Sequence, residues 1–271
     1  MVTTMYKAII SDYDGTLASK ETGVCERNKK AITELVGKGF RFALCTGRMT
    51  ASAMQIIKNL PIRPLVGSYN GSEITDSATG EKLYSKALTA EETLPLIDFA
   101  EERGANYQLY NDIGVFPAYE SAATRMYSEV CGCPSTPIAD LREFLIKELK
   151  TTPKFMIIDE RADEILPVAV KKFADKYEIA RCYDGMIDFT PKGVDKGSVV
   201  RALADIWKIS PDEIIAIGDE CNDIPMLKSA GLGVAALNAG ETVKQNAGYV
   251  TTVDCGKGAV AEVIERFILC E

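Results

Sequence analysis

Two aspartates, Asp12 and Asp14, stand directly after a short apolar run and are followed by Gly15. The three continuous apolar residues before them predict a buried strand over Tyr6–Ile10, because a strand of a parallel sheet is covered on both faces. The two carboxylates then lie at the carboxyl end of that strand, where open α/β sheets bind their ligands. The one-residue spacing lets both side chains point the same way while the chain is extended.

Two carboxylates this close repel each other unless a positive charge lies between them. No basic residue occurs between Ile9 and Ala18, so a bound divalent cation is the simplest partner for the pair. The alternative is an exposed turn, since Asp and Gly are both common turn residues. The Asp-x-Asp-Gly pattern taken alone leaves the two interpretations open.

The composition narrows the range of functions. A chain of 271 residues with 46% hydrophobic side chains predicts one large core with an insertion, or two domains. The net charge of -8 argues against nucleic acid or an anionic membrane as the main partner. Histidine is absent, which excludes Ser-His-Asp hydrolysis and leaves acid–base chemistry to carboxylates, Lys, Tyr or Cys. With neither a signal-like amino terminus nor a long apolar segment, we expect a cytoplasmic protein.

The eight cysteines are scattered without a C-x-x-C framework, and we interpret them as reduced thiols. Cys131 and Cys133 are the most closely spaced pair, with only Gly132 between them. Such a pair can hold a metal or form a redox couple. Because no histidine accompanies it, a surface loop is the favoured interpretation.

The segment after the aspartates alternates between helix and strand patterns. The elements expected there are a helix over Glu26–Lys38, a strand over Phe40–Cys45, a helix over Thr50–Leu60 and a strand over Leu65–Tyr69. The first of these two strands leads into Thr46-Gly47. This pair on its own is typical of an ordinary strand-to-helix turn.

An inserted domain is expected next, because from Ser72 to Leu88 the pattern changes to hairpin-like runs. A helix followed by two short strands then occurs twice, over 90–117 and 163–189, which suggests an open sheet with helices on one face. We therefore predict a core domain over 1–76, an α/β cap domain over 77–190 and the rest of the core over 191–271. The aromatic residues of the cap are interpreted as sheet packing rather than as a platform for a sugar ring; they are Tyr107, Tyr110, Phe116, Tyr119 and Tyr127.

Two later stretches carry further polar residues. Lys196 stands in the first turn of an expected helix, where a cation opposes the helix dipole, so either an anion binds there or the lysine is solvated. The next strand, Glu213–Ile217, leads into Gly218-Asp219-Glu220-Cys221-Asn222-Asp223. This stretch concentrates carboxylates without neighbouring cations, as oxygen-preferring Mg²⁺ requires.

Together these stretches resemble the motifs of the haloacid dehalogenase superfamily, and in particular its Cof-type branch. The matching segments are Asp12-Tyr13-Asp14-Gly15-Thr16-Leu17, Cys45-Thr46-Gly47-Arg48, Lys196-Gly197 and Gly218 to Asp223. The resemblance covers nearly the whole chain. It implies an α/β fold, with a Rossmann-like doubly wound parallel-sheet core and an inserted α+β cap of the C2B type between the second and third motifs.

The resemblance also implies a role for each site residue. Asp12 is the expected nucleophile, and Asp14 the acid and then the base. The residues expected to bind phosphate are Thr46, Gly47, Lys196 and Asn222. The residues expected to hold Mg²⁺ are Asp12, Asp14 through its backbone carbonyl, Asp219 and, in support, Asp223.

The implied function is a Mg²⁺-dependent phosphomonoester hydrolase that acts on a small phosphorylated metabolite, such as a sugar phosphate. A sugar phosphomutase and a nonenzymatic phosphometabolite-binding protein are the alternatives. We expect no nucleic-acid or membrane partner, and a monomer or small homo-oligomer.

Overall fold

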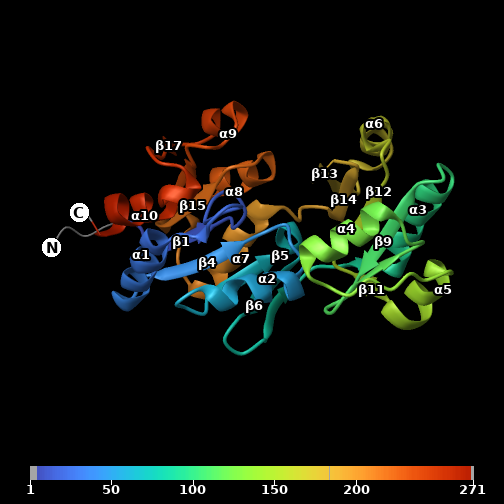
Figure 1. Cartoon of the computed structure of the whole chain (residues 1–271), viewed down its shortest axis with the longest axis horizontal. Helices are drawn as coiled ribbons and strands as arrows, with labels where there is room; N and C mark the ends of the chain where they lie inside the picture. The colour runs from blue at the N-terminus through green and yellow to red at the C-terminus, as the bar shows by residue number, and fades with distance from the viewer. Residues whose placement is uncertain (1–4, 183, 270–271) are drawn as a thin grey trace. The chain divides into compact units, whose positions relative to one another are not determined.

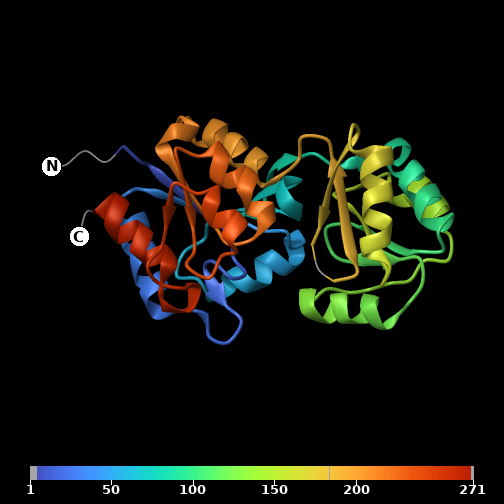
Figure 2. The same cartoon turned by 90° about the horizontal axis from the view of Figure 1, so that it is seen from above.

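The structure, a computed structural model, describes residues 5–182 and 184–269 (Figures 1 and 2). The chain divides into two compact units. The core unit contains the chain up to Thr46, Ile56–Tyr84 and the chain from Asp195 on; the inserted unit contains Gly47–Gln55 and Ser85–Val194. The domain limits expected from the sequence, at 76/77 and 190/191, lie a few residues from these boundaries and stay our proposal.

The core unit is built on one sheet with the strand order β17-β16-β15-β1-β4-β5-β6-β7. Neighbouring strands from β17 to β5 are parallel, and β6 runs antiparallel to β5. The strands are β1 (Ala8–Ser11), β4 (Arg41–Cys45), β5 (Leu65–Ser68), β6 (Glu73–Asp76), β7 (Lys82–Ser85), β15 (Ile214–Gly218), β16 (Leu232–Ala235) and β17 (Tyr249–Val250). The small hairpin of β2 (Ala18–Ser19) and β3 (Gly23–Val24) follows β1.

Helices cover both faces of this sheet (Figure 2). Ala8 and Ile10 of β1 pack with Val200 and Leu203 of α7 (Lys196–Trp207) and with α8 (Ile224–Ser229). The opposite face is covered by α1 (Glu26–Gly37) and α10 (Ala259–Ile264). A short helix, α9 (Glu241–Gln245), follows β16. The predicted doubly wound α/β core is confirmed.

The inserted unit has an antiparallel sheet with the order β10-β9-β12-β14-β13. Its strands are β9 (Asn106–Tyr110), β10 (Val115–Pro117), β12 (Phe155–Ile158), β13 (Tyr177–Arg181) and β14 (Met186–Pro191), and β8 (Leu88–Thr89) pairs separately with β11 (Thr151–Thr152). Its helices are α2 (Thr50–Ile56, whose last residue belongs to the core unit), α3 (Ala90–Glu101), α4 (Ala122–Cys131), α5 (Leu141–Phe144) and α6 (Ala162–Phe173). The predicted repeat of one helix and two strands is present as α3-β9-β10 and α6-β13-β14.

An apolar core joins one face of this second sheet to α3 and α6. Phe99 and Phe173 of the two helices belong to the same buried cluster as Tyr107, Leu109 and Phe155 of the sheet. The next residue of β9, Tyr110, points to the opposite face, because side chains alternate along a strand. There its ring meets the Tyr127 ring of α4 edge-on, with centroids 6.2 Å apart.

The expectation that all helices lie on one face is therefore wrong for α4, since a helical pattern marks an apolar face without saying which surface it will cover. The packing role expected of the aromatic residues is confirmed where partners are found: Tyr107 stacks on Phe155, Tyr110 meets Tyr127, and Phe116 meets Phe144. Tyr119 is exposed instead. Among the described residues, no helix combines the length and apolar character needed to cross a membrane.

Candidate active site

The site residues follow three neighbouring strands of the core sheet. Asp12 follows β1, Thr46 follows β4 and Asp219 follows β15. Because these strands are parallel neighbours, their carboxyl ends meet at one edge of the sheet. The strand order also reverses direction around β1, and such switch points are where doubly wound sheets bind ligands.

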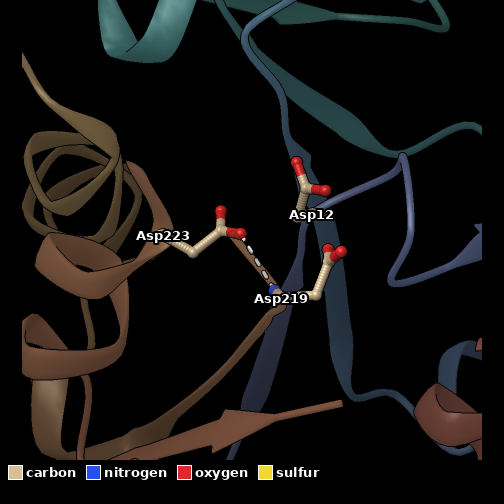
Figure 3. Close-up of side chains that lie close together, drawn as sticks. All are labelled: Asp12, Asp219 and Asp223. Carbon is tan, nitrogen blue, oxygen red and sulfur yellow. Dashed lines mark hydrogen bonds between the residues drawn. The ribbon is translucent and has the colours of Figure 1, made fainter. Parts of the chain in front are cut away.

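Three buried carboxylates converge at this edge (Figure 3). One oxygen from each of Asp12, Asp219 and Asp223 lies within 4.8 Å of the others. The Asp223 carboxylate is held in place, since its Oδ2 accepts hydrogen bonds of 3.0 Å from the backbone N–H groups of Asp219 and Glu220. Among the described residues, this is the cluster of acidic side chains able to hold a metal, and the side chain of Asp14 is not part of it.

Lys196 supplies a positive charge inside the cluster. Its Nζ lies 2.7 Å from Asp12 Oδ1 and 2.6 Å from Asp223 Oδ1, and the side chain is only 2% exposed. The interpretation of Lys196 as a solvated lysine is therefore wrong. The interpretation that the carboxylates lack a neighbouring cation is also wrong, because Lys196 lies between Asp12 and Asp223. The sequence could not reveal this contact, because 184 positions separate Lys196 from Asp12.

The electrostatics of the cluster follow from its burial. Burial raises the pKa of Asp12 well above its ordinary range; Lys196 lowers it in part, and the charges of Asp223 and Asp219 raise it further. Burial also raises the pKa of Asp219 to about 6, although a hydrogen bond from Thr16 opposes the shift. For Lys196, burial alone lowers the pKa, but Asp12 and Asp223 outweigh it and the pKa lies well above the ordinary value.

These residues fit a hard divalent cation. The donors are carboxylate oxygens, which Mg²⁺ and Ca²⁺ prefer, and three buried carboxylates carry more negative charge than the one lysine offsets. Asp12 and Asp219 are best placed to bind such an ion, because both oxygens of Asp223 are already engaged by Lys196 and by two backbone N–H groups.

Two residues of the Asp turn support Asp219. Thr16 is fully buried, and its hydroxyl donates a 2.5 Å hydrogen bond to Asp219 Oδ1. Gly15 has a φ of +80°, and a Cβ there would lie 2.2 Å from Asp219 Oδ2. Asn238 fixes the same turn from another loop by donating a 2.8 Å hydrogen bond to the Gly15 carbonyl. Neither Thr16 nor Asn238 is among the site residues expected from the sequence, although Thr16 lies within the first motif.

Asn70 joins two of the residues expected to bind phosphate. The Asn222 amide donates a 3.1 Å hydrogen bond to Asn70 Oδ1, and the Asn70 backbone N–H donates to the Thr46 carbonyl at 3.2 Å. Asn70 adopts a left-handed conformation with a φ of +56°, which asparagine tolerates better than most residues. Thr46 and Asn222 are thus linked through Asn70, which follows the strand expected over Leu65–Tyr69.

The remaining site residues flank this arrangement. Asp14 is half-buried, and its backbone forms an isolated β-bridge with Ala18. Gly47 is half-buried and begins the segment assigned to the inserted unit. The fold and the carboxylate–lysine cluster together define an α/β protein with a buried anionic site at the switch point of its sheet.

Comparison with known proteins gives the family. The model of the haloacid dehalogenase-like hydrolases matches residues 9–264, so the chain belongs to that family and is a hydrolase. The resemblance inferred from the motifs is confirmed.

Relatives that are named as phosphatases match over nearly their whole length. YwtE and YcsE of Bacillus subtilis, both named 5-amino-6-(5-phospho-D-ribitylamino)uracil phosphatase, are 27% and 26% identical to this chain. The alignments cover 97% of this chain in both cases, and 98% of YwtE and 96% of YcsE. The solved structure of BT1666 from Bacteroides thetaiotaomicron, described among the phosphatases of the haloalkanoate superfamily, matches with a TM-score of 0.83 and 28% identity, covering 97% of this chain and 95% of that one.

Proposed function

We propose that the protein is a Mg²⁺-dependent phosphomonoester hydrolase that acts through an aspartyl-phosphate intermediate. The observation that carries the proposal is the convergence of Asp12, Asp219 and Asp223 around Lys196 at the carboxyl ends of β1 and β15. A buried carboxylate next to an ammonium, with further carboxylates for a cation, suits attack on an anionic phosphate. The names of YwtE and YcsE support the same class of reaction.

The first half-reaction forms the intermediate. A carboxylate oxygen of Asp12 attacks phosphorus, and the bond between phosphorus and the ester oxygen breaks. Asp14, two residues further along the same turn, gives its proton to the leaving alkoxide, which departs as an alcohol. Asp12 then carries the phosphoryl group and Asp14 is ionised.

The second half-reaction restores the enzyme. Asp14 takes a proton from a water molecule, whose oxygen attacks phosphorus. The bond between phosphorus and Asp12 breaks, inorganic phosphate leaves, and Asp12 is again a carboxylate. Using one residue as acid and then as base balances the protons over the cycle.

The other site residues hold the phosphate. Lys196 and Asn222 would contact the nonreacting oxygens together with Thr46 and Gly47, where negative charge spreads in a loose transition state. Asp12, the Asp14 carbonyl and Asp219 would hold Mg²⁺, with Asp223 in support, and the bound ion would supply positive charge that offsets the charge of the phosphate and of the carboxylates around it.

The proposed substrate is a small phosphorylated metabolite in the cytoplasm. YwtE and YcsE are named for a phosphorylated ribityl compound, which has a sugar-like chain ending in a phosphomonoester. The net charge of -8 opposes approach of a polyanion such as nucleic acid. We therefore expect sugar and sugar-alcohol phosphates to be better substrates than phosphopeptides or nucleic acids, which a parallel panel of phosphate-release assays would test.

The decisive variant is Asp12→Asn, which removes the nucleophile but keeps the size of the side chain. With Mg²⁺ present, hydrolysis of an aryl phosphate should fall by at least about 10³-fold, because the remaining groups can bind but not attack. The matched control is Asp205→Asn on the exposed side of α7, which should keep full activity. Substantial phosphate release by folded Asp12→Asn would refute the nucleophile assignment.

Product analysis separates hydrolysis from phosphoryl transfer between sugar hydroxyls. The proposal expects inorganic phosphate to account for the substrate consumed, because water accepts the phosphoryl group. If a hexose phosphate is instead converted mainly to its isomer, the protein is a phosphomutase.

A further inference from the structure

The inserted unit contains a pair of cysteines that the proposed phosphatase chemistry does not use. Cys131 is the last residue of α4, and Gly132 turns the chain with a left-handed φ of +60°. The Cys133 backbone N–H donates back to the Ser128 carbonyl at 3.2 Å, and the Ser128 hydroxyl donates to the Cys133 carbonyl at 2.5 Å. These bonds fold Cys133 back beside Cys131.

The two cysteines are buried, and only Gly132 separates them. Cys131 is 8% exposed and Cys133 is 6% exposed, so the surface-loop interpretation of this motif is wrong. The two thiols act on each other, so that the pKa of Cys131 is lowered and the pKa of Cys133 is raised. A second cysteine in the same hydrogen-bonded turn distinguishes Cys131 from a lone cysteine, because it offers a partner for a disulfide.

The surroundings of Cys131 favour its thiolate. The hydrogen bond from Cys133 lowers the pKa of Cys131 to about 7 in spite of burial, and a hydrogen bond with Tyr127 and the charges of Lys154 and Arg48 act in the same direction. Lys154 is itself buried and paired with Asp188 at 2.9 Å. The same interaction raises the pKa of Cys133, so Cys131 is the thiol of the pair that ionises more easily.

We propose that Cys131 and Cys133 form a reversible dithiol–disulfide pair, in which Cys131 reacts with a hydroperoxide and Cys133 resolves the product. In the first step the Cys131 thiolate attacks the peroxide; a sulfur–oxygen bond forms, the oxygen–oxygen bond breaks, and the released alkoxide or hydroxide takes up a proton. In the second step the Cys133 sulfur attacks the Cys131 sulfenic acid and water leaves, carrying the Cys133 proton. Two thiols have lost two electrons and one peroxide has been reduced.

Several features of the turn suit this chemistry. Low exposure favours a small oxidant over a bulky protein disulfide. Gly132 allows the left-handed turn that a side chain would strain, and its carbonyl accepts a 3.1 Å hydrogen bond from the Gln55 amide of α2. A thiol reductant such as dithiothreitol would reverse the reaction by exchange.

The full-length protein can be tested by peptide mass analysis. Trypsin cleaves after Arg125 and Arg142 and releases Met126–Arg142, whose only cysteines are Cys131 and Cys133. After brief treatment with a small excess of hydrogen peroxide and then iodoacetamide, this peptide should lack both alkyl groups and have lost two hydrogen atoms. Dithiothreitol should restore full alkylation. A peptide that remains fully alkylated, or that carries only sulfinic or sulfonic acid, overturns the proposal.

Single variants assign the two roles. Cys133→Ser should stop at the Cys131 sulfenic acid, which dimedone traps, whereas Cys131→Ser should leave Cys133 unoxidised under the same exposure. Cys182→Ser, a cysteine elsewhere in the inserted unit, is the matched control and should form the disulfide as the unchanged protein does. Equal peroxide reactivity of Cys131→Ser and Cys133→Ser would contradict the assignment. If Zn²⁺ instead protects both thiols stoichiometrically and peroxide does not couple them, the pair is a metal site and not a redox couple.

Discussion

Thr16 shows how a residue beside a site tunes it without reacting. Its hydroxyl donates to Asp219 Oδ1 at 2.5 Å from a fully buried position. A donor aimed at one carboxylate oxygen fixes the orientation of the carboxylate and stabilises its ionised form. Such supporting bonds typically change metal affinity by about 10- to 100-fold.

Replacing Thr16 by valine should therefore weaken metal activation while preserving the packing. We expect the Mg²⁺ concentration for half-maximal phosphatase activity to rise by at least about 10-fold in Thr16→Val. Thr33→Val, on the exposed side of α1, removes a hydroxyl that bonds only a helix carbonyl and should leave that concentration unchanged. An unaltered Mg²⁺ titration in folded Thr16→Val would show that the hydrogen bond is dispensable.

The pKa of Cys131 gives a second prediction at this scale. The thiolate fraction rises with pH, so alkylation of Cys131 should increase through a midpoint near pH 7, set by its pKa of about 7. In Cys133→Ala the hydrogen-bond donor is lost, and the midpoint should move to higher pH. Rates of iodoacetamide labelling of the Met126–Arg142 peptide from pH 5.5 to 9 measure both midpoints. Coincident midpoints would mean that Cys133 does not stabilise the thiolate.

Site residues that share a short motif could be predicted from the sequence, and those joined only by the fold could not. Asp219 and Asp223 are recognisable because they stand together after a strand. The role of Lys196 as the cation between Asp12 and Asp223, and the bond from Asn222 to Asn70, depend on chain segments 184 and 152 positions apart. A local sequence pattern cannot predict contacts between residues so far apart along the chain.

At the scale of elements, the turn after β5 is held against the start of α7, the helix that carries Lys196. Gly71 in this turn has a φ of +115°, and a Cβ on it would lie 2.4 Å from the Asp195 carbonyl oxygen and 2.9 Å from Ser198 Oγ. The close approach requires a glycine. It ties the position of Lys196 to that of Asn70.

The variant Gly71→Ala should consequently lower the free energy of unfolding by more than backbone strain alone would. We expect a loss of at least about 2 kcal/mol in the free energy of unfolding, because strain and a clash with backbone add together. Gly80→Ala is the matched control, because the φ of Gly80 is +77° but no atom lies within 4 Å of the added Cβ. The free energy of unfolding of this variant should fall by only about 1 kcal/mol. Urea unfolding of the two variants provides the comparison, and equal losses would argue against the clash.

The periodicity of apolar residues along the chain predicts the helices and strands better than it predicts which surfaces they pack against. The helix expected over Glu26–Lys38 and the strand expected over Phe40–Cys45 each differ from α1 and β4 by one residue at one end. The position of α4 on the second face of its sheet was not predicted, because burial of Tyr127 against Tyr110 is decided by tertiary packing. The same limit applies to the pair of cysteines at its end, whose burial depends on what α4 covers.

At the scale of the whole molecule, each unit has its own apolar core. Phe155 belongs to the core of the inserted unit and Leu203 to that of the core unit, and both are fully buried. The single tryptophan, Trp207, lies in the core unit. Its fluorescence therefore reports on one unit, whereas far-UV circular dichroism reports on both.

Two truncations should separate the stabilities of the units. The free energy of unfolding should fall by about 3–5 kcal/mol in Phe155→Ala and by about 2–5 kcal/mol in Leu203→Ala. In urea, Phe155→Ala is expected to give an early transition in circular dichroism with an unchanged Trp207 midpoint, while Leu203→Ala should shift the Trp207 midpoint. If both probes shift together in both variants, the chain unfolds as one cooperative unit.

The pairing of β1 with β15 also sets the order in which the protein can fold as it is synthesised. Ala8 is the neighbour of Ile214 in the central sheet, and every residue of the inserted unit precedes β15. Domains fold as units while the ribosome is still translating. We expect the inserted unit to fold on the nascent chain while β1 still lacks one neighbour, so that the carboxylate cluster assembles only after Asp219 and Asp223 emerge. The nascent protein would thus be without an active site until the last part of its synthesis.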